Sequence, residues 1–147
     1  GETVTEDQAK AGYLVRTGST LISSGGTNTG EHLGFMNLNG RGLYALQNAV
    51  AQVTFGKFTN CNHGVRASNQ AFIQVRWGDV SDCKGFGLMC DSSMINASSI
   101  TGDDCYAFAI STNNGSLMAI NATAKRSILN SVQVVDNGNL VATDSDF

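Results

Sequence analysis

The chain has 147 residues, a formal net charge of −3, 41% hydrophobic residues and no proline. This length suits one domain or part of one, and the weak charge, with no basic run longer than Lys125-Arg126, argues against nucleic-acid binding. No apolar run approaches the roughly 18 residues of a membrane-spanning helix, so no membrane span is expected.

Residues 1–38 do not follow the pattern of the remaining chain, and we predict that they form a cap or a junction to another domain. The first residues, GETVTEDQAK, are acidic and polar, so no signal peptide is expected here. Residues 13–15 predict a short strand. Residues 19–30 are rich in Ser, Gly, Thr and Asn and predict a loop. Residues 33–38 predict the strand that leads into the rest of the chain.

From Asn39 onward the chain is built from repeats. Three of the four cysteines, Cys61, Cys83 and Cys105, lie 22 residues apart, and a fixed period of this size is typical of a stacked solenoid. Apolar residues recur at the same period at two positions that are two residues apart, as on one face of a strand. These two columns are Val53, Val75, Ala97, Ala119, Val141 and Ala51, Ile73, Ile95, Leu117.

A second short strand is predicted earlier in each repeat. It is marked by Leu43 and Val65 and then, after a slip of one residue, by Leu88, Ile110 and Val132. Polar residues stand at the expected corners, in two sets: Asn69, Asp91, Asn113 and Asn60, Asp82, Asp104. Asn and Asp suit such corners because they tolerate the left-handed α conformation.

These features predict an all-β fold. The repeats contain no sustained helical stripe of apolar residues, and the consensus of leucine-rich repeats is absent. We therefore predict a right-handed parallel β-helix with coils of about 22 residues over residues 39–147. Five coils make a short β-helix, so we expect the chain to be a segment of a longer protein.

The repeat places Cys61, Cys83 and Cys105 on top of one another. We expect three small, buried, reduced thiols at an inward position, as is common for cysteine. The alternative is a disulfide, which would leave one of the three without a partner unless Cys90 supplied it. No Cys-x-x-Cys spacing, phosphate loop or dinucleotide fingerprint occurs, so neither a metal nor a cofactor is predicted. Reduced cysteines indicate assembly in a cytosol.

Residues 102–105 read Gly-Asp-Asp-Cys. This run resembles one in the polygalacturonase branch of the pectin-lyase-like superfamily of right-handed β-helices, and residues 39–126 resemble that fold. In that branch both aspartates belong to the acid/base set. The resemblance therefore implies a polysaccharide hydrolase or lyase that uses Asp103 and Asp104, and stacking of coils would bring Asp82 beside them.

The chain departs from that branch in several places. Phe86 stands where a further carboxylate is required, and the downstream Gly-His-Gly and Arg-x-Lys motifs are absent. The regular coils also leave little material for the walls of a catalytic cleft. The alternative interpretation is that Asp103 and Asp104 are corner residues that accept hydrogen bonds from backbone N–H groups.

Trp77 and Arg76 are candidates for a carbohydrate-binding platform, because aromatic rings and guanidinium groups suit the faces of sugars. Two other positions are open to Trp77. It follows Val75 by two residues and would then point inward, or it covers a neighbouring subunit. Phe55, Phe58 and Trp77 are the candidates for an apolar face that supports a trimer.

The chain as a whole resembles the β-helical domains of bacteriophage tailspikes and tail fibres, which are often trimeric. This resemblance implies a structural and receptor-binding segment of a homotrimer that contacts bacterial surface polysaccharide. It also implies a place in the virion tail after assembly in the host cytoplasm. Two alternatives remain: a polysaccharide hydrolase or lyase, and the passenger domain of a bacterial surface adhesin.

Overall fold

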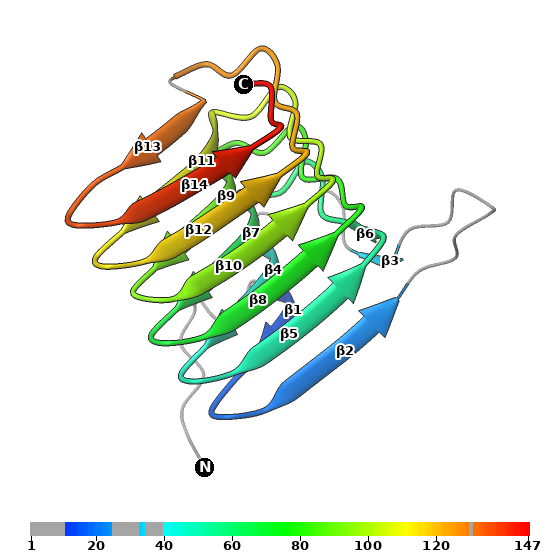
Figure 1. Cartoon of the computed structure of the whole chain (residues 1–147). Helices are drawn as coiled ribbons and strands as arrows, with labels where there is room; N and C mark the ends of the chain where they lie inside the picture. The colour runs from blue at the N-terminus through cyan, green and yellow to red at the C-terminus, as the bar shows by residue number, and fades with distance from the viewer. Residues whose placement is uncertain (1–10, 25–32, 35–39, 130) are drawn as a thin grey trace.

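The structure, a computed structural model, describes residues 11–24, 33–34, 40–129 and 131–147. Along these residues the chain forms strands and turns only, wound into a parallel β-helix (Figure 1). None of the described segments is a helix long and apolar enough to cross a membrane. The predicted all-β parallel β-helix is confirmed.

Two six-stranded sheets form the main sides of the solenoid. Sheet A contains, in spatial order, β1 (Ala11–Val15), β4 (Arg41–Leu46), β7 (His63–Ser68), β9 (Phe86–Asp91), β11 (Ala107–Thr112) and β13 (Val132–Val134). Sheet B contains β2 (Thr20–Ser24), β5 (Val50–Thr54), β8 (Phe72–Arg76), β10 (Met94–Ser98), β12 (Ser116–Ile120) and β14 (Asn139–Thr143). Within both sheets, neighbouring strands are parallel and come from successive coils.

A third, narrower side closes each coil. It begins with the short pair β3 (Leu33–Gly34) and β6 (Gly56–Lys57) and continues as single parallel bridges from coil to coil. The bridged residues are Lys57, Asp79, Thr101, Thr123 and Asp146. Each coil therefore has three sides, and the core lies between them.

The core is built from the alternation of side chains along each strand. In β5 the residues Ala51 and Val53 point inward and are buried, while Gln52 between them is exposed. Phe58 is also fully buried, so its predicted role at a trimer surface is wrong. The reason is the space beside Gly42, where a Cβ atom would lie only 2.6 Å from that of Phe58.

The corners use the left-handed α conformation, as predicted for one set of residues. Asn60, Asp82 and Asp104 have φ angles of 52°, 58° and 56°. In the other set the prediction is confirmed at Asn69 and Asn113, with φ angles of 54° and 50°. It is wrong for Asp91, which is the last residue of β9, and Ser92 takes the left-handed conformation instead with φ 47°.

The predicted register is wrong at two points. Leu88 pairs with Ala109 and not with Ile110, because the extra residue between Cys83 and Leu88 is cancelled by a shorter turn after β9. In the last coil Ala142 pairs with Ala119, whereas Val141 pairs with Met118 and is 45% exposed. That coil has gained one residue before β13, which the 22-residue repeat did not reveal.

The N-terminal part joins the same solenoid. The strand predicted at residues 13–15 is confirmed as part of β1. The loop predicted at residues 19–30 is wrong for β2, which pairs with β5 because Leu21 opposes Ala51 and packs against the core; residues 25–30 lie outside the described residues. The strand predicted at residues 33–38 is described only at β3. A cap or junction role for residues 1–38 stays a prediction.

Candidate functional site

The cysteine column has a structural role. Cys61, Cys83 and Cys105 form a buried cluster of reduced thiols, as predicted. The Cys105 thiol donates a hydrogen bond to the carbonyl of Val80 at 3.1 Å. A hydrogen bond with Cys105, together with burial, raises the pKa of the Cys83 thiol. Among the described residues no group of three or more His, Cys, Asp or Glu side chains is arranged to hold a metal ion.

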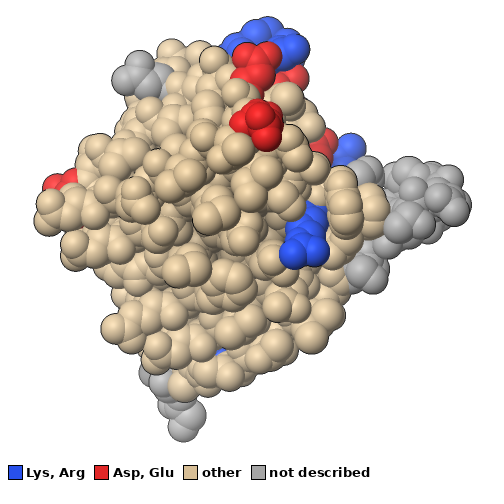
Figure 2. Space-filling view, viewed as in Figure 1, with Lys and Arg blue, Asp and Glu red and all other residues tan. Residues whose placement is uncertain are grey.

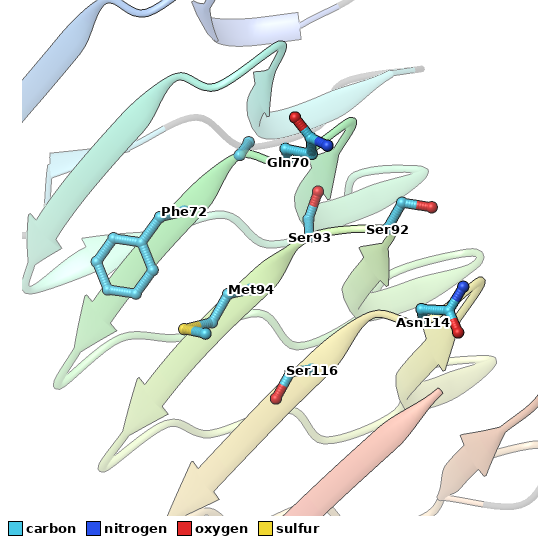
Figure 3. A pocket seen from close by; sticks show the side chains of 8 residues that line it. Gln70, Phe72, Ser92, Ser93, Met94, Asn114 and Ser116 are labelled. Atoms are coloured by element: carbon cyan, nitrogen blue, oxygen red, sulfur yellow. The ribbon is translucent and has the colours of Figure 1, made fainter. Parts of the chain in front are cut away.

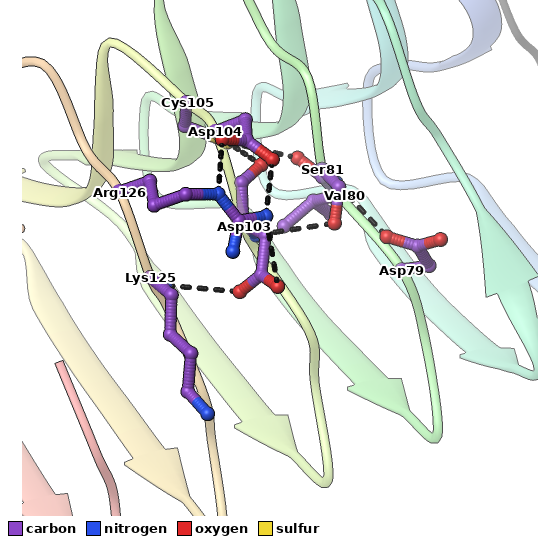
Figure 4. Close-up of polar contacts among 8 residues, drawn as sticks. All are labelled: Asp79, Val80, Ser81, Asp103, Asp104, Cys105, Lys125 and Arg126. Carbon is purple, nitrogen blue, oxygen red and sulfur yellow. Dashed lines mark hydrogen bonds and ion pairs between the residues drawn. The ribbon is translucent and has the colours of Figure 1, made fainter.

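Two of the candidate catalytic aspartates, Asp103 and Asp104, lie together at one corner of the solenoid (Figure 4). The Asp82 N–H donates to the carbonyl of Asp103 at 2.8 Å, which fixes the two coils against each other. The Asp103 carboxylate accepts a hydrogen bond from the Lys125 N–H at 2.9 Å. Arg126 holds Asp104 with two hydrogen bonds, of 2.7 Å from Nε and 2.5 Å from Nη2.

These contacts bear on the chemistry of the corner. The hydrogen bond from Arg126 lowers the pKa of the Asp104 carboxyl. A general acid in glycoside hydrolysis must carry a proton near neutral pH, so Asp104 is poorly suited to that step. The observed contacts are those of a corner that joins successive coils. A catalytic role for Asp82, Asp103 and Asp104 stays a prediction.

Trp77 lies on the surface at a different corner. Its φ angle is 48°, in the left-handed region, which large side chains seldom adopt. The chain turns there, so the ring does not follow Val75 into the core and is 51% exposed. The indole stacks on Phe55, one coil away, with ring centroids 5.3 Å apart and planes inclined by 15°. Phe55 has the same conformation, with φ 56°.

A groove of about 380 Å³ runs beside this aromatic stack. Its lining residues are Phe55, Trp77, Gly78, Asp79, Ser99 and Thr101. Asp79 accepts a hydrogen bond from the Ser81 N–H at 3.0 Å, which fixes one carboxylate oxygen. An aromatic face beside a carboxylate and two hydroxyl groups is a combination that suits a ligand with an apolar face and polar edges. Arg76 is exposed at the end of β8 and is not among the lining residues.

Sequence reasoning identified Trp77 but missed the hydroxyl groups of Ser99 and Thr101. The signal was present, because Phe55, Trp77 and Ser99 are 22 residues apart and therefore share one corner. All three have positive φ angles. The repeat thus predicts the neighbours of Trp77 once its corner position is known.

The groove lies at one edge of the outer surface of sheet B, which we call the sheet B face. Figure 2 shows that this face carries little charge. Among the outward positions of β5, β8, β10, β12 and β14, only Arg76 is charged. These positions are Val50, Gln52, Thr54, Phe72, Gln74, Arg76, Met94, Asn96, Ser98, Ser116, Met118, Ile120, Asn139, Val141 and Thr143.

No family model, curated protein or solved structure matches this chain. The function is therefore inferred from the fold, from the Trp77 groove and from the sheet B face.

Proposed function

We propose that this β-helix is a structural and receptor-binding segment of a phage tailspike or tail fibre that holds bacterial surface polysaccharide at the Trp77 groove. The observation that carries the proposal is the exposed stack of Trp77 on Phe55 beside Asp79. Sugars have an apolar face of C–H groups and a rim of hydroxyl groups. The indole face matches the first, and the carboxylate and the hydroxyl groups of Ser99 and Thr101 match the second.

Preorganisation supports this use of the site. Trp77 and Phe55 are held on successive coils by the parallel pairing of β5 with β8, and their backbones occupy the same restricted conformation. A ring that is already in place loses little conformational entropy when a ligand binds. The site therefore suits repeated, moderate contacts along a polymer.

The proposed protein is a homotrimer in the virion tail, assembled in the host cytoplasm. The reduced thiols fit that compartment, because cytosolic proteins seldom form disulfides. The coils are joined by parallel ladders on three sides, which gives the stiffness that a fibre requires. The passenger domain of a surface adhesin is the alternative with the same fold, and a signal peptide encoded at the start of the full-length gene would decide for it.

Binding to an array of bacterial oligosaccharides tests the proposal. Trp77→Ala should weaken binding about tenfold or more, because it removes the stacking surface. Tyr106→Ala is the matched control: this ring is also exposed, at 39%, but does not line the groove. Both variants are first compared with the wild type by circular dichroism and thermal unfolding. Equal binding by Trp77→Ala and the wild type would overturn the proposal.

The hydrolase or lyase alternative has its own measurement. The wild type and Asp103→Asn are incubated with the bound polysaccharide, and new reducing ends are counted. Under the proposed function neither protein releases them. Release by the wild type that is lost in Asp103→Asn would establish the enzyme instead. Release that persists in this variant would move the activity to another site.

A further inference from the structure

A notch interrupts the corner where sheet A leads into sheet B. Three residues join β7 to β8 and three join β11 to β12, but only Ser92 and Ser93 join β9 to β10. This shorter turn is the one that cancels the extra residue before β9. The coil is drawn in at this point between two longer neighbours, so the notch is a direct consequence of the register.

The notch has a volume of about 370 Å³ (Figure 3). Phe72, Met94 and Ala71 supply apolar surface on the side of the strands. The other lining residues carry amide or hydroxyl groups: Gln70, Ser92, Ser93, Asn114 and Ser116. None of the lining residues is charged.

Ser93 is the buried polar residue among those that line the notch. The residue is only 9% exposed, and its buried Oγ has no hydrogen-bond partner. Figure 3 shows this hydroxyl between Gln70 and Ser92. The turn itself is well satisfied, because the carbonyl of Ser93 accepts a hydrogen bond from the Ser116 N–H at 2.8 Å. A buried hydroxyl without a partner is unfavourable, and rotation of the Ser93 side chain about its Cα–Cβ bond toward the notch would let a ligand satisfy it.

We infer that the notch binds one uncharged sugar unit of the polysaccharide, an inference that rests on the proposed function and adds a second subsite to it. The apolar face of the sugar lies on Phe72 and Met94, and its hydroxyl groups bond to Ser93, Gln70 and Asn114. The ligand is neutral because no cation lines the notch. A uronate or sialate carboxylate would lose its hydration there without gaining an opposite charge.

The two subsites lie at opposite ends of the same strand. Phe72 begins β8 at the notch, and Trp77 follows its last residue at the groove. A strand of this length spans roughly 13 Å, and the sheet B face between its ends carries only Arg76 as a charge. One polysaccharide chain that crosses the sheet along the strands therefore reaches both subsites.

Methionine methyl groups provide a direct reporter. Met94 lines the notch, whereas Met118 lies on the same face and does not, and the two are similarly exposed at 51% and 40%. The protein is labelled with ¹³C-methyl methionine and titrated with glucose, galactose, mannose, N-acetylglucosamine and glucuronate. At least one neutral sugar should shift the Met94 resonance in a saturable manner, while Met118 stays in place and glucuronate has no effect.

Ser93→Ala separates binding from stability. It should weaken the Met94 response about fivefold or more, because a hydrogen bond to the sugar is lost. It should leave the melting temperature unchanged or raised, because it removes a buried hydroxyl without a partner. A second variant inserts one asparagine between Ser92 and Ser93, restores the turn length of the neighbouring coils, and should abolish the response by filling the notch.

The outcomes distinguish the two subsites. If no neutral sugar shifts the Met94 resonance while the Trp77 indole resonance does shift, the notch is not a subsite and the proposed function still stands. A Met94 response to glucuronate equal to that of the neutral sugars would overturn the neutral specificity. If the sugars shift neither the Met94 nor the Trp77 resonance and the protein does not bind the oligosaccharide array, both proposals are overturned.

Discussion

At the scale of single residues, the buried thiols make the sharpest prediction. All four cysteines are buried, and burial raises the pKa of Cys90 to about 11. The thiolate is the reactive form, and burial shields all four sulfur atoms from the reagent, so the folded protein at pH 8 should resist iodoacetamide at all four positions. Mass spectrometry should show full alkylation only in denaturant. Thr123→Cys, which places a thiol at an exposed position, is the control and should react in the folded state.

The raised pKa of Cys90 predicts a loss of stability at alkaline pH. The pKa of the Cys90 thiol lies near its ordinary value of 9.0 in the unfolded chain but at about 11 in the folded chain. Between these values the unfolded state binds fewer protons, so the free energy of unfolding falls as pH rises, by about 2–3 kcal/mol in all. Urea unfolding at pH 7, 9 and 10.5 measures this fall. Cys90→Ala should be less stable at pH 7 and should show a shallower decline; an equal decline in both proteins would assign the effect to other groups.

At the scale of the element, close packing behind the third side decides stability. A Cβ atom at Gly102 would overlap the ring of Phe108, which is fully buried. Gly102→Ala should therefore reduce the free energy of unfolding by about 1–3 kcal/mol. Urea unfolding measures it, with Thr123→Ala as the control because Thr123 holds an exposed bridge position one coil later. Equal stability of the two variants would show that the Phe108 ring moves at little cost.

The elements also show what the sequence can predict. The 22-residue spacing of Cys61, Cys83 and Cys105 identifies the solenoid, because stacked coils must place equivalent residues in one column. The same spacing conceals the register of β9. One residue is gained before that strand and one is lost after it, so the period of the cysteines and of sheet B is unchanged. The 22-residue repeat therefore aligns Leu88 with Ile110, although Ala109 is the inward residue opposite Leu88.

The candidate site was predictable only in part. The exposure of Trp77 depends on its left-handed conformation. Large side chains seldom adopt this conformation, so an aromatic residue after an alternating strand does not predict such a turn. The contact between Asp103 and Lys125 was easier to predict, because Lys125 lies 22 residues later at the same corner. No local motif predicts the notch. Its prediction would require the lengths of two neighbouring turns, and these lengths depend on the register.

At the scale of the whole molecule, the proposal requires a trimer. Light scattering during size-exclusion chromatography should give a mass three times that of the 15.4 kDa chain. A stable monomer at micromolar concentration would count against the tail-fibre assignment, while the glycan-binding variants would still test the two subsites.

The extra residue before β9 is cancelled within a single strand and turn, so the coils above and below stay in phase. Under the proposed function this has an evolutionary meaning. A lineage that follows a changing host coat can reshape its recognition surface by paired gains and losses of single codons. The thiol column and the parallel ladders beneath would keep their register through such changes.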